Sequence, residues 1–137
     1  MKLVAPVLFV LALLSGPQPT SSEDRAQLVL ISAGLPMYPL VARVAHMTGT
    51  VEASFVVDAN GNVLSVEILS GPNLLGNLAQ KNILTWKFEG PGDPSHEPWK
   101  DQSTFVYKLT GDSADTLAVK MNSYRHVEID APAVTIQ

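Results

Sequence analysis

The stretch TVEASFVVDANGNVLSVEILSG, residues 50–71, decides the fold because its apolar residues recur with a period of two. From Val51 to Val57 every second residue is apolar, and the same alternation returns from Leu64 to Ile68. Such alternation is typical of strands that bury one face and expose the other. The stretch therefore predicts two strands of one antiparallel hairpin.

The connector between these strands is Asp58-Ala59-Asn60-Gly61, which has two interpretations. Aspartate at the first turn position and glycine at the fourth are typical of a type I turn followed by a left-handed residue. A calcium loop would need further oxygen ligands and a distal glutamate, which Asn62, Val63 and Leu64 do not supply. We therefore predict that these residues turn the chain and hold no metal.

Two helices and a third strand are predicted around the hairpin. Tyr38-Pro39 precedes apolar residues at helical spacing as far as Met47, and Gly49 is expected to end this short helix. Residues 73–86 carry a second apolar stripe of helical period. Residues 104–110 alternate again and predict a third strand. The predicted fold class is α+β, with both helices packed on one face of a small antiparallel sheet that has a three-stranded core.

Composition limits the classes of function. The 137 residues are 46% hydrophobic and 16% charged, which suits a single globular domain. The net charge of -4, without a run of lysine or arginine, argues against nucleic-acid partners. Because the chain has no cysteine, disulfides, thiolate catalysis, cysteine zinc sites and a lipoprotein anchor are excluded.

Catalytic and metal sites find no support in the sequence. His46, His96 and His126 have no paired spacing and no Glu-x-x-His partner, so a metal-dependent hydrolase is the weakest hypothesis. Neither a nucleophile elbow nor a glycine-rich phosphate loop occurs. We therefore assign no catalytic residues, no metal and no cofactor, and we expect that the protein is not an enzyme.

The N-terminus has the layout of a secretory signal peptide, which we predict over residues 1–22. Positive charge at Met1-Lys2 precedes an apolar run that ends at Leu14, about 18 Å as a helix against roughly 30 Å of membrane hydrocarbon. Residues 23–34 are interpreted as a linker and a short extended segment. We expect export to the periplasm; the alternative is a short uncleaved inner-membrane anchor that leaves the domain facing the periplasm.

Several short motifs together resemble the C-terminal domain of the TonB family over residues 35–109. In chain order they are Tyr38-Pro39, Gly49-Thr50-Val51, Asp58, Gly61, Val63, Ile68-Leu69-Ser70-Gly71, Leu74-Leu75 and Trp86-Lys87-Phe88. The resemblance implies two helices on one side of a three-stranded antiparallel sheet, in agreement with the periodicity. We assign residues 35–111 to this domain and leave residues 112–137 as a C-terminal extension with strand-like segments.

The resemblance implies a protein-binding role in outer-membrane transport. Such domains bind a short N-terminal peptide of an outer-membrane receptor, a TonB-box-like segment, and pass on force from inner-membrane motor proteins. Binding occurs by strand addition at an exposed sheet edge. The residues that the resemblance assigns to the peptide are Thr104, Phe105, Val106, Tyr107, Lys108 and Leu109, with Leu35 and Tyr38 close by. This expectation requires that the outer edge of the third strand be open.

The chain also departs from the family pattern. It has a short hydrophobic run in place of a full membrane helix, and the segment from Leu14 to Leu35 reaches roughly 70 Å when extended. Leu35 stands where well-studied members place a receptor-contacting glutamine. An alternative is therefore a self-associating envelope scaffold that uses the same edge strand for homodimerisation.

Overall fold

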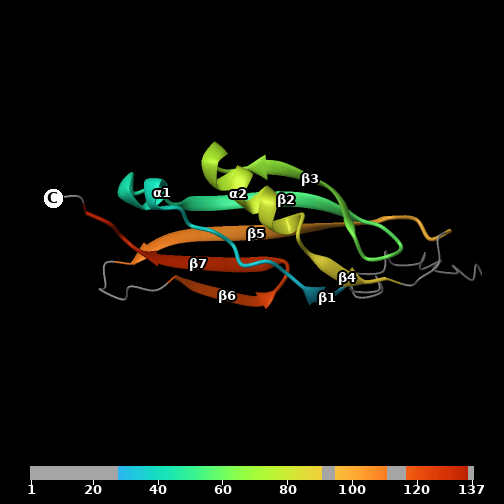
Figure 1. Ribbon diagram of the computed structural model, residues 1–137. Helices are drawn as coiled ribbons and strands as arrows, with labels where there is room; N and C mark the ends of the chain where they lie inside the picture. Colours follow the sequence, from blue (N-terminus) through green and yellow to red (C-terminus); the bar gives the residue numbers. More distant parts are fainter. Residues whose placement is uncertain (1–27, 91–94, 111–116, 136–137) are drawn as a thin grey trace, which may run out of the picture.

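A computed structural model describes residues 28–90, 95–110 and 117–135 (Figure 1). The elements are β1 (Val29–Ser32), α1 (Leu40–Val44), β2 (Gly49–Val57), β3 (Val63–Ser70), α2 (Asn73–Ile83), β4 (Lys87–Glu89), β5 (Trp99–Thr110), β6 (Ala118–Ser123) and β7 (His126–Pro132). The predicted signal peptide, residues 1–22, lies outside the described residues. Within the described ranges, none of the helices has the length and apolar character that a membrane span requires.

The main sheet has five strands in the order β3-β2-β5-β7-β6, as Figure 1 shows. β2 is antiparallel to both β3 and β5, and β7 is antiparallel to β6 but parallel to β5. A separate two-stranded ribbon joins β1 to β4. The α+β class is confirmed, and the sheet is wider than its predicted three-stranded core because the C-terminal extension contributes β6 and β7.

The β2–β3 hairpin is confirmed, and the turn between its strands uses Asp58 as predicted. One carboxylate oxygen of Asp58 accepts hydrogen bonds from the backbone N–H groups of Asn60 and Asn62, each at 2.9 Å. The N–H of Asp58 donates to the carbonyl of Asn62 at 2.9 Å, and Gly61 has φ +86°. The carboxylate is therefore used to close the turn.

The same turn is seated on β4, which explains why its fourth residue is glycine. The N–H of Phe88 donates to the carbonyl of Gly61 at 2.8 Å. A Cβ atom at Gly61 would lie 1.7 Å from the carbonyl oxygen of Phe88, and its positive φ disfavours any other residue. The hairpin turn and β4 therefore fit together only without a side chain at this position.

Both helices end earlier than the apolar spacing predicted. α1 ends at Val44 because His46 adopts a left-handed conformation, φ +52°, which stops the helix before Gly49. α2 ends at Ile83 because tight hydrogen bonds from the N–H groups of Thr85 and Trp86 turn the chain into β4. The stripe of apolar residues continues past the helix end since the turn keeps Trp86 over the sheet.

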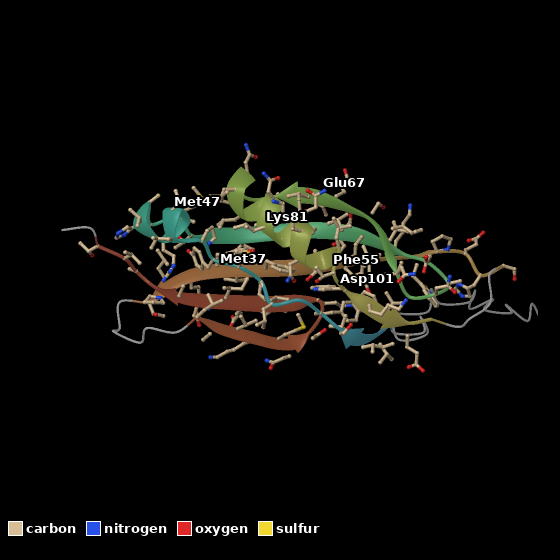
Figure 2. All side chains as sticks on the ribbon, viewed as in Figure 1. Met37, Met47, Phe55, Glu67, Lys81 and Asp101 are labelled. Carbon is tan, nitrogen blue, oxygen red and sulfur yellow. The ribbon has the colours of Figure 1, made fainter. Side chains whose placement is uncertain are left out.

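The core lies between the sheet and the layer formed by α1, α2 and the β1–β4 ribbon, which cover one sheet face in Figure 1. Met37 and Lys81, labelled in Figure 2, lie on this covered side. Trp86 is 2% exposed; its ring stacks on Phe105 at 5.9 Å between centroids and meets Phe55 edge-on at 5.7 Å. Trp86 is therefore a core residue. The main sheet contributes Val51, Ala53, Phe55, Val57, Phe105, Tyr107, Val127, Ile129 and Ala131 to this core.

Candidate functional site

The predicted peptide-binding strand is the C-terminal half of β5. Phe105 and Tyr107 point into the core and are 0% and 1% exposed, whereas Lys108 lies on the exposed face. Among the described residues, the Tyr107 hydroxyl has no hydrogen-bond partner, and burial raises its pKa. The alternation of inward and outward side chains is what a strand that receives a peptide needs.

The outer edge of this strand, however, is not open. β7 lies parallel to β5 in an unbroken register of seven residue pairs, from Thr104 with His126 to Thr110 with Pro132. β2 pairs with the other side of β5. The prediction of an open edge along Thr104–Leu109 is therefore wrong, because the chain places a strand of its own there.

Side chains on both faces hold β7 against β5. On the core face Val127, Ile129 and Ala131 are at most 1% exposed. On the exposed face Lys108 Nζ lies 3.3 Å from Glu128 Oε1. Hydrogen bonds from His126 and from Lys108 lower the pKa of the Glu128 carboxyl group. Apolar burial on one face is thus combined with an exposed ion pair on the other.

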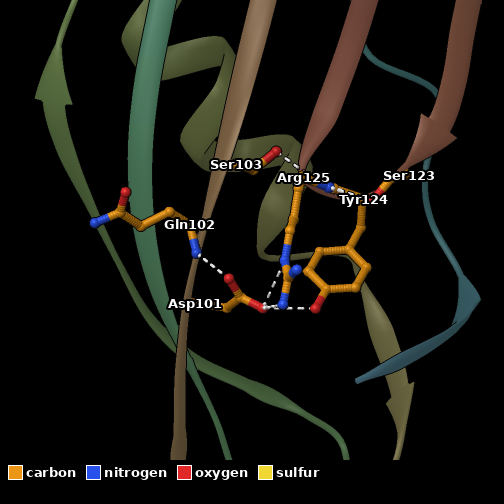
Figure 3. Close-up of polar contacts among 6 residues, drawn as sticks. All are labelled: Asp101, Gln102, Ser103, Ser123, Tyr124 and Arg125. Atoms are coloured by element: carbon orange, nitrogen blue, oxygen red, sulfur yellow. Dashed lines mark hydrogen bonds and ion pairs between the residues drawn. The ribbon is translucent and has the colours of Figure 1, made fainter. Parts of the chain in front are cut away.

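The turn between β6 and β7 is fastened to β5 by four residues, which we call the Asp101 cluster: Asp101, Ser103, Tyr124 and Arg125 (Figure 3). The Tyr124 hydroxyl donates to Asp101 Oδ2 at 2.5 Å, and the Arg125 guanidinium donates to the same oxygen at 3.1 and 3.3 Å. The Ser103 hydroxyl donates to the Tyr124 carbonyl at 2.5 Å. One carboxylate therefore binds two consecutive residues of the turn.

Tyr124 connects this polar cluster to the aromatic core. Its side chain is largely buried, and its ring meets that of Phe88 edge-on at 5.2 Å. Burial, and secondarily the hydrogen bond to Asp101, raise the pKa of Tyr124 to about 12. The hydrogen bond to Asp101 also raises the pKa of Arg125. The turn is thus anchored by both packing and charge.

Of the other two predicted contacts, only Tyr38 adjoins β5. Its hydroxyl donates to the carbonyl of Met47, and its ring meets Tyr107 edge-on at 5.3 Å. Tyr38 is 5% exposed, so it supports β5 from within the core and offers no surface to a peptide.

Leu35 lies elsewhere on the surface. It is 83% exposed and lines a groove of about 180 Å³ beside α2, with Leu78 and Thr85, and no residue of β5 lines that groove. The adjacent Gly34 is tied to the helix end because the side-chain amide of Asn82 donates to its carbonyl at 2.7 Å. The structure therefore does not bring Leu35 to the edge of β5.

The sequence did not reveal that β7 is the neighbour of β5, and it did not reveal the Asp101 cluster. The alternation of Val127, Ile129 and Ala131 was the available signal for a half-buried strand. No local motif links Asp101 to Tyr124, because they are 23 positions apart in the sequence. Their contact follows only from the strand order.

Comparisons with known proteins agree on the domain that contains β5. The family model for the Gram-negative bacterial TonB protein C-terminal matches residues 35–109. A solution NMR structure of the Pseudomonas aeruginosa TonB C-terminal domain superimposes with a TM-score of 0.50 and 15% sequence identity, covering 61% of this chain and 88% of that one. At this identity the likeness concerns the fold alone. No curated protein matches the chain. β6 and β7 lie beyond the residues that the family model matches.

Proposed function

The chain belongs to the family of Gram-negative bacterial TonB protein C-terminal domains, and on this premise we propose that it is a periplasmic domain that binds a peptide segment of an outer-membrane receptor. The family is non-catalytic and associated with energy transduction for outer-membrane transport in the cell envelope.

The proposed site is the outer edge of β5, along Thr104–Leu109, and the proposed mode is strand addition. The observation that supports it is the pairing of β5 with β7. The extended segment along this edge is β7 of the same chain, and its alternate side chains are buried in the core. A receptor peptide that took the place of β7 would find the same backbone donors and acceptors. The peptide therefore exchanges with β7.

The compartment and the further partners are part of the same proposal. Export through residues 1–22 brings the domain to the periplasm, where receptor N-terminal segments are accessible; retention of these residues as a short anchor would leave it at the inner membrane facing the same space. Contact with inner-membrane motor proteins is the route by which force would reach the bound receptor.

The test is a titration of isotope-labelled protein with synthetic peptides that copy receptor N-terminal segments, followed by backbone amide shifts. We expect shifts along Thr104–Leu109 and also along Val127–Ala131, because β7 leaves as the peptide enters. Shifts confined to β3 or β6, or an absence of shifts with every peptide, would contradict the proposal.

Self-association is the second candidate function, and one observation favours it. β6 is the last strand of the sheet, so the backbone groups on its outer side have no strand partner among the described residues. Homodimerisation through β5 itself would instead require two copies to exchange their β6–β7 hairpins. Molecular mass measured from micromolar to millimolar concentration decides this: a constant monomer mass removes the candidate, and a rising mass supports it.

A further inference from the structure

We propose that β7 is an internal stand-in for the peptide ligand, so that the β6–β7 hairpin closes the site and the pattern of β7 specifies the ligand. This inference rests on the proposed function, because it concerns the same edge of β5. The ligand would be an extended peptide that runs parallel to β5 and carries small or branched apolar side chains at alternate positions.

The ligand pattern follows from the space that β7 fills. Val127, Ile129 and Ala131 enter the core beside Phe105 and Tyr107 and are almost completely buried. If a peptide replaced β7, larger side chains at these positions would clash with the core, and polar side chains would be buried without partners. Close-packed interiors tolerate both poorly. The exposed face selects less strongly, although an acidic side chain there would meet Lys108 as Glu128 does.

The hairpin is built to leave as a unit. Among the described strands, β7 and β6 join the rest of the sheet through β5 alone. The Asp101 cluster then fastens the turn of the hairpin to the start of β5 (Figure 3). Asp101 therefore holds the hairpin against β5.

Closure by β7 reduces the apparent affinity for a peptide in trans. A strand of the same chain competes at a high effective concentration. The observed dissociation constant equals the intrinsic constant divided by the fraction of molecules whose hairpin is open. Any change that loosens the Asp101 cluster without disturbing β5 must therefore strengthen peptide binding.

The first experiment loosens the Asp101 cluster in the full chain by combining Tyr124→Phe, which keeps the ring, with Arg125→Ala. The probe is a labelled synthetic peptide, HVEIDAP, which copies residues 126–132. We expect about tenfold tighter binding than to the wild type. Lys120→Ala is the matched control, because it removes the same charge from the same hairpin outside the cluster; its affinity should equal that of the wild type. Equal affinity of all three proteins would overturn the inference.

A companion peptide, HDEDDAP, replaces the two branched apolar residues with aspartate. It should not bind to the loosened variant, because its carboxylates would enter the core. Binding as strong as that of HVEIDAP would overturn the ligand pattern.

The second experiment locks the hairpin. The natural chain has no cysteine, so Thr110→Cys with Pro132→Cys gives one defined pair of thiols. These positions are partners in the β5–β7 register, and Cα atoms on neighbouring strands, about 5 Å apart, lie within disulfide range. We expect the oxidised form to bind HVEIDAP at least tenfold more weakly than the reduced form.

The two proposals fail in different ways. Equal binding of receptor peptides by the oxidised and reduced forms would overturn the inference and with it the β5 edge as the binding site, since the ligand would not need β7 to leave, while receptor binding by the domain would survive. No binding of any receptor peptide to the wild type, the reduced form or the loosened variant would overturn the proposed function.

Discussion

The block formed by β2, β3, α2 and β5 and the hairpin formed by β6 and β7 share one core, but they are held in it differently. β2 is paired on both sides and covered by α2, and Trp86 packs across it and β5. The hairpin reaches the block through one strand. Its buried residues nevertheless complete the core, since Tyr124 packs against Phe88.

This difference shows how one small domain combines a permanent scaffold with a removable part. Free energies of local opening differ between regions according to how many neighbours each region must release. To open, the block must separate β2 from two neighbouring strands and from α2, whereas the hairpin releases one strand pairing, the Asp101 cluster and the buried side chains of β7. We therefore expect substitutions in the block to act globally and substitutions in the hairpin to act locally.

The largest expected effect tests the block. Trp86→Ala should lower the free energy of unfolding by about 3 to 5 kcal/mol, because it empties the space between Phe55 and Phe105. Urea unfolding followed by circular dichroism measures this. Leu84→Ala is the control, because Leu84 is 49% exposed; it should lower the free energy of unfolding by roughly 1 kcal/mol or less. A similar loss from both variants would contradict the packing described.

The next effect tests the hairpin. Ile129→Ala should cost about 2 to 4 kcal/mol of hairpin stability, because a fully buried branched side chain is lost from β7. Hydrogen exchange should show the loss of protection in β7 and only a smaller loss in β2. Equal losses in both strands would mean that the hairpin does not open separately.

Much of the block was predictable from local pattern. The period of two in β2 and β3 and the turn chemistry of Asp58 and Gly61 act between near neighbours in sequence. The helix ends were less predictable, because a left-handed His46 and a tight turn after Ile83 depend on the surrounding packing. β1 and β4 are short strands that only their mutual pairing defines.

The site was less predictable than the fold, for a topological reason. The alternation in β7 indicates a strand but not its partner. Parallel strands need a crossover connection, and here β6 (Ala118–Ser123) lies between β5 and β7 in the chain. Whether β6 or β7 would lie next to β5 follows from the packing of Val127 and Ile129, which no local signal encodes.

A smaller effect concerns the Asp101 cluster. Tyr124→Phe should lower the free energy of unfolding by about 1 to 2 kcal/mol at pH 7, because a hydrogen bond to a carboxylate is lost while the ring stays. The variant should also respond less to alkali. Since the pKa of Tyr124 is raised from 10.0 to about 12, its contribution is complete below pH 10 and disappears as the pH rises to about 12. Urea unfolding at pH 8, 10 and 11 measures how the free energy of unfolding of each protein changes with pH. An equal change for wild type and variant would exclude this role.

The smallest effect concerns the exposed ion pair between β5 and β7. The lowered pKa of Glu128 means that its contribution is present above the ordinary carboxyl pKa and is lost as the pH falls through the lowered value. Because the pair is exposed, Glu128→Gln should leave unfolding at pH 7 nearly unchanged. A large loss, persisting at high salt, would show that this face holds the hairpin more than the Asp101 cluster does.

The most direct measurement is native-state hydrogen exchange of the full wild-type chain, residue by residue, without added peptide. If the hairpin opens while the block stays folded, the amides of Val127–Ala131 that bond to β5 will exchange with a clearly lower opening free energy than those of Val51–Val57 in β2. Identical opening free energies for the two strands, equal to that of global unfolding, would contradict the account.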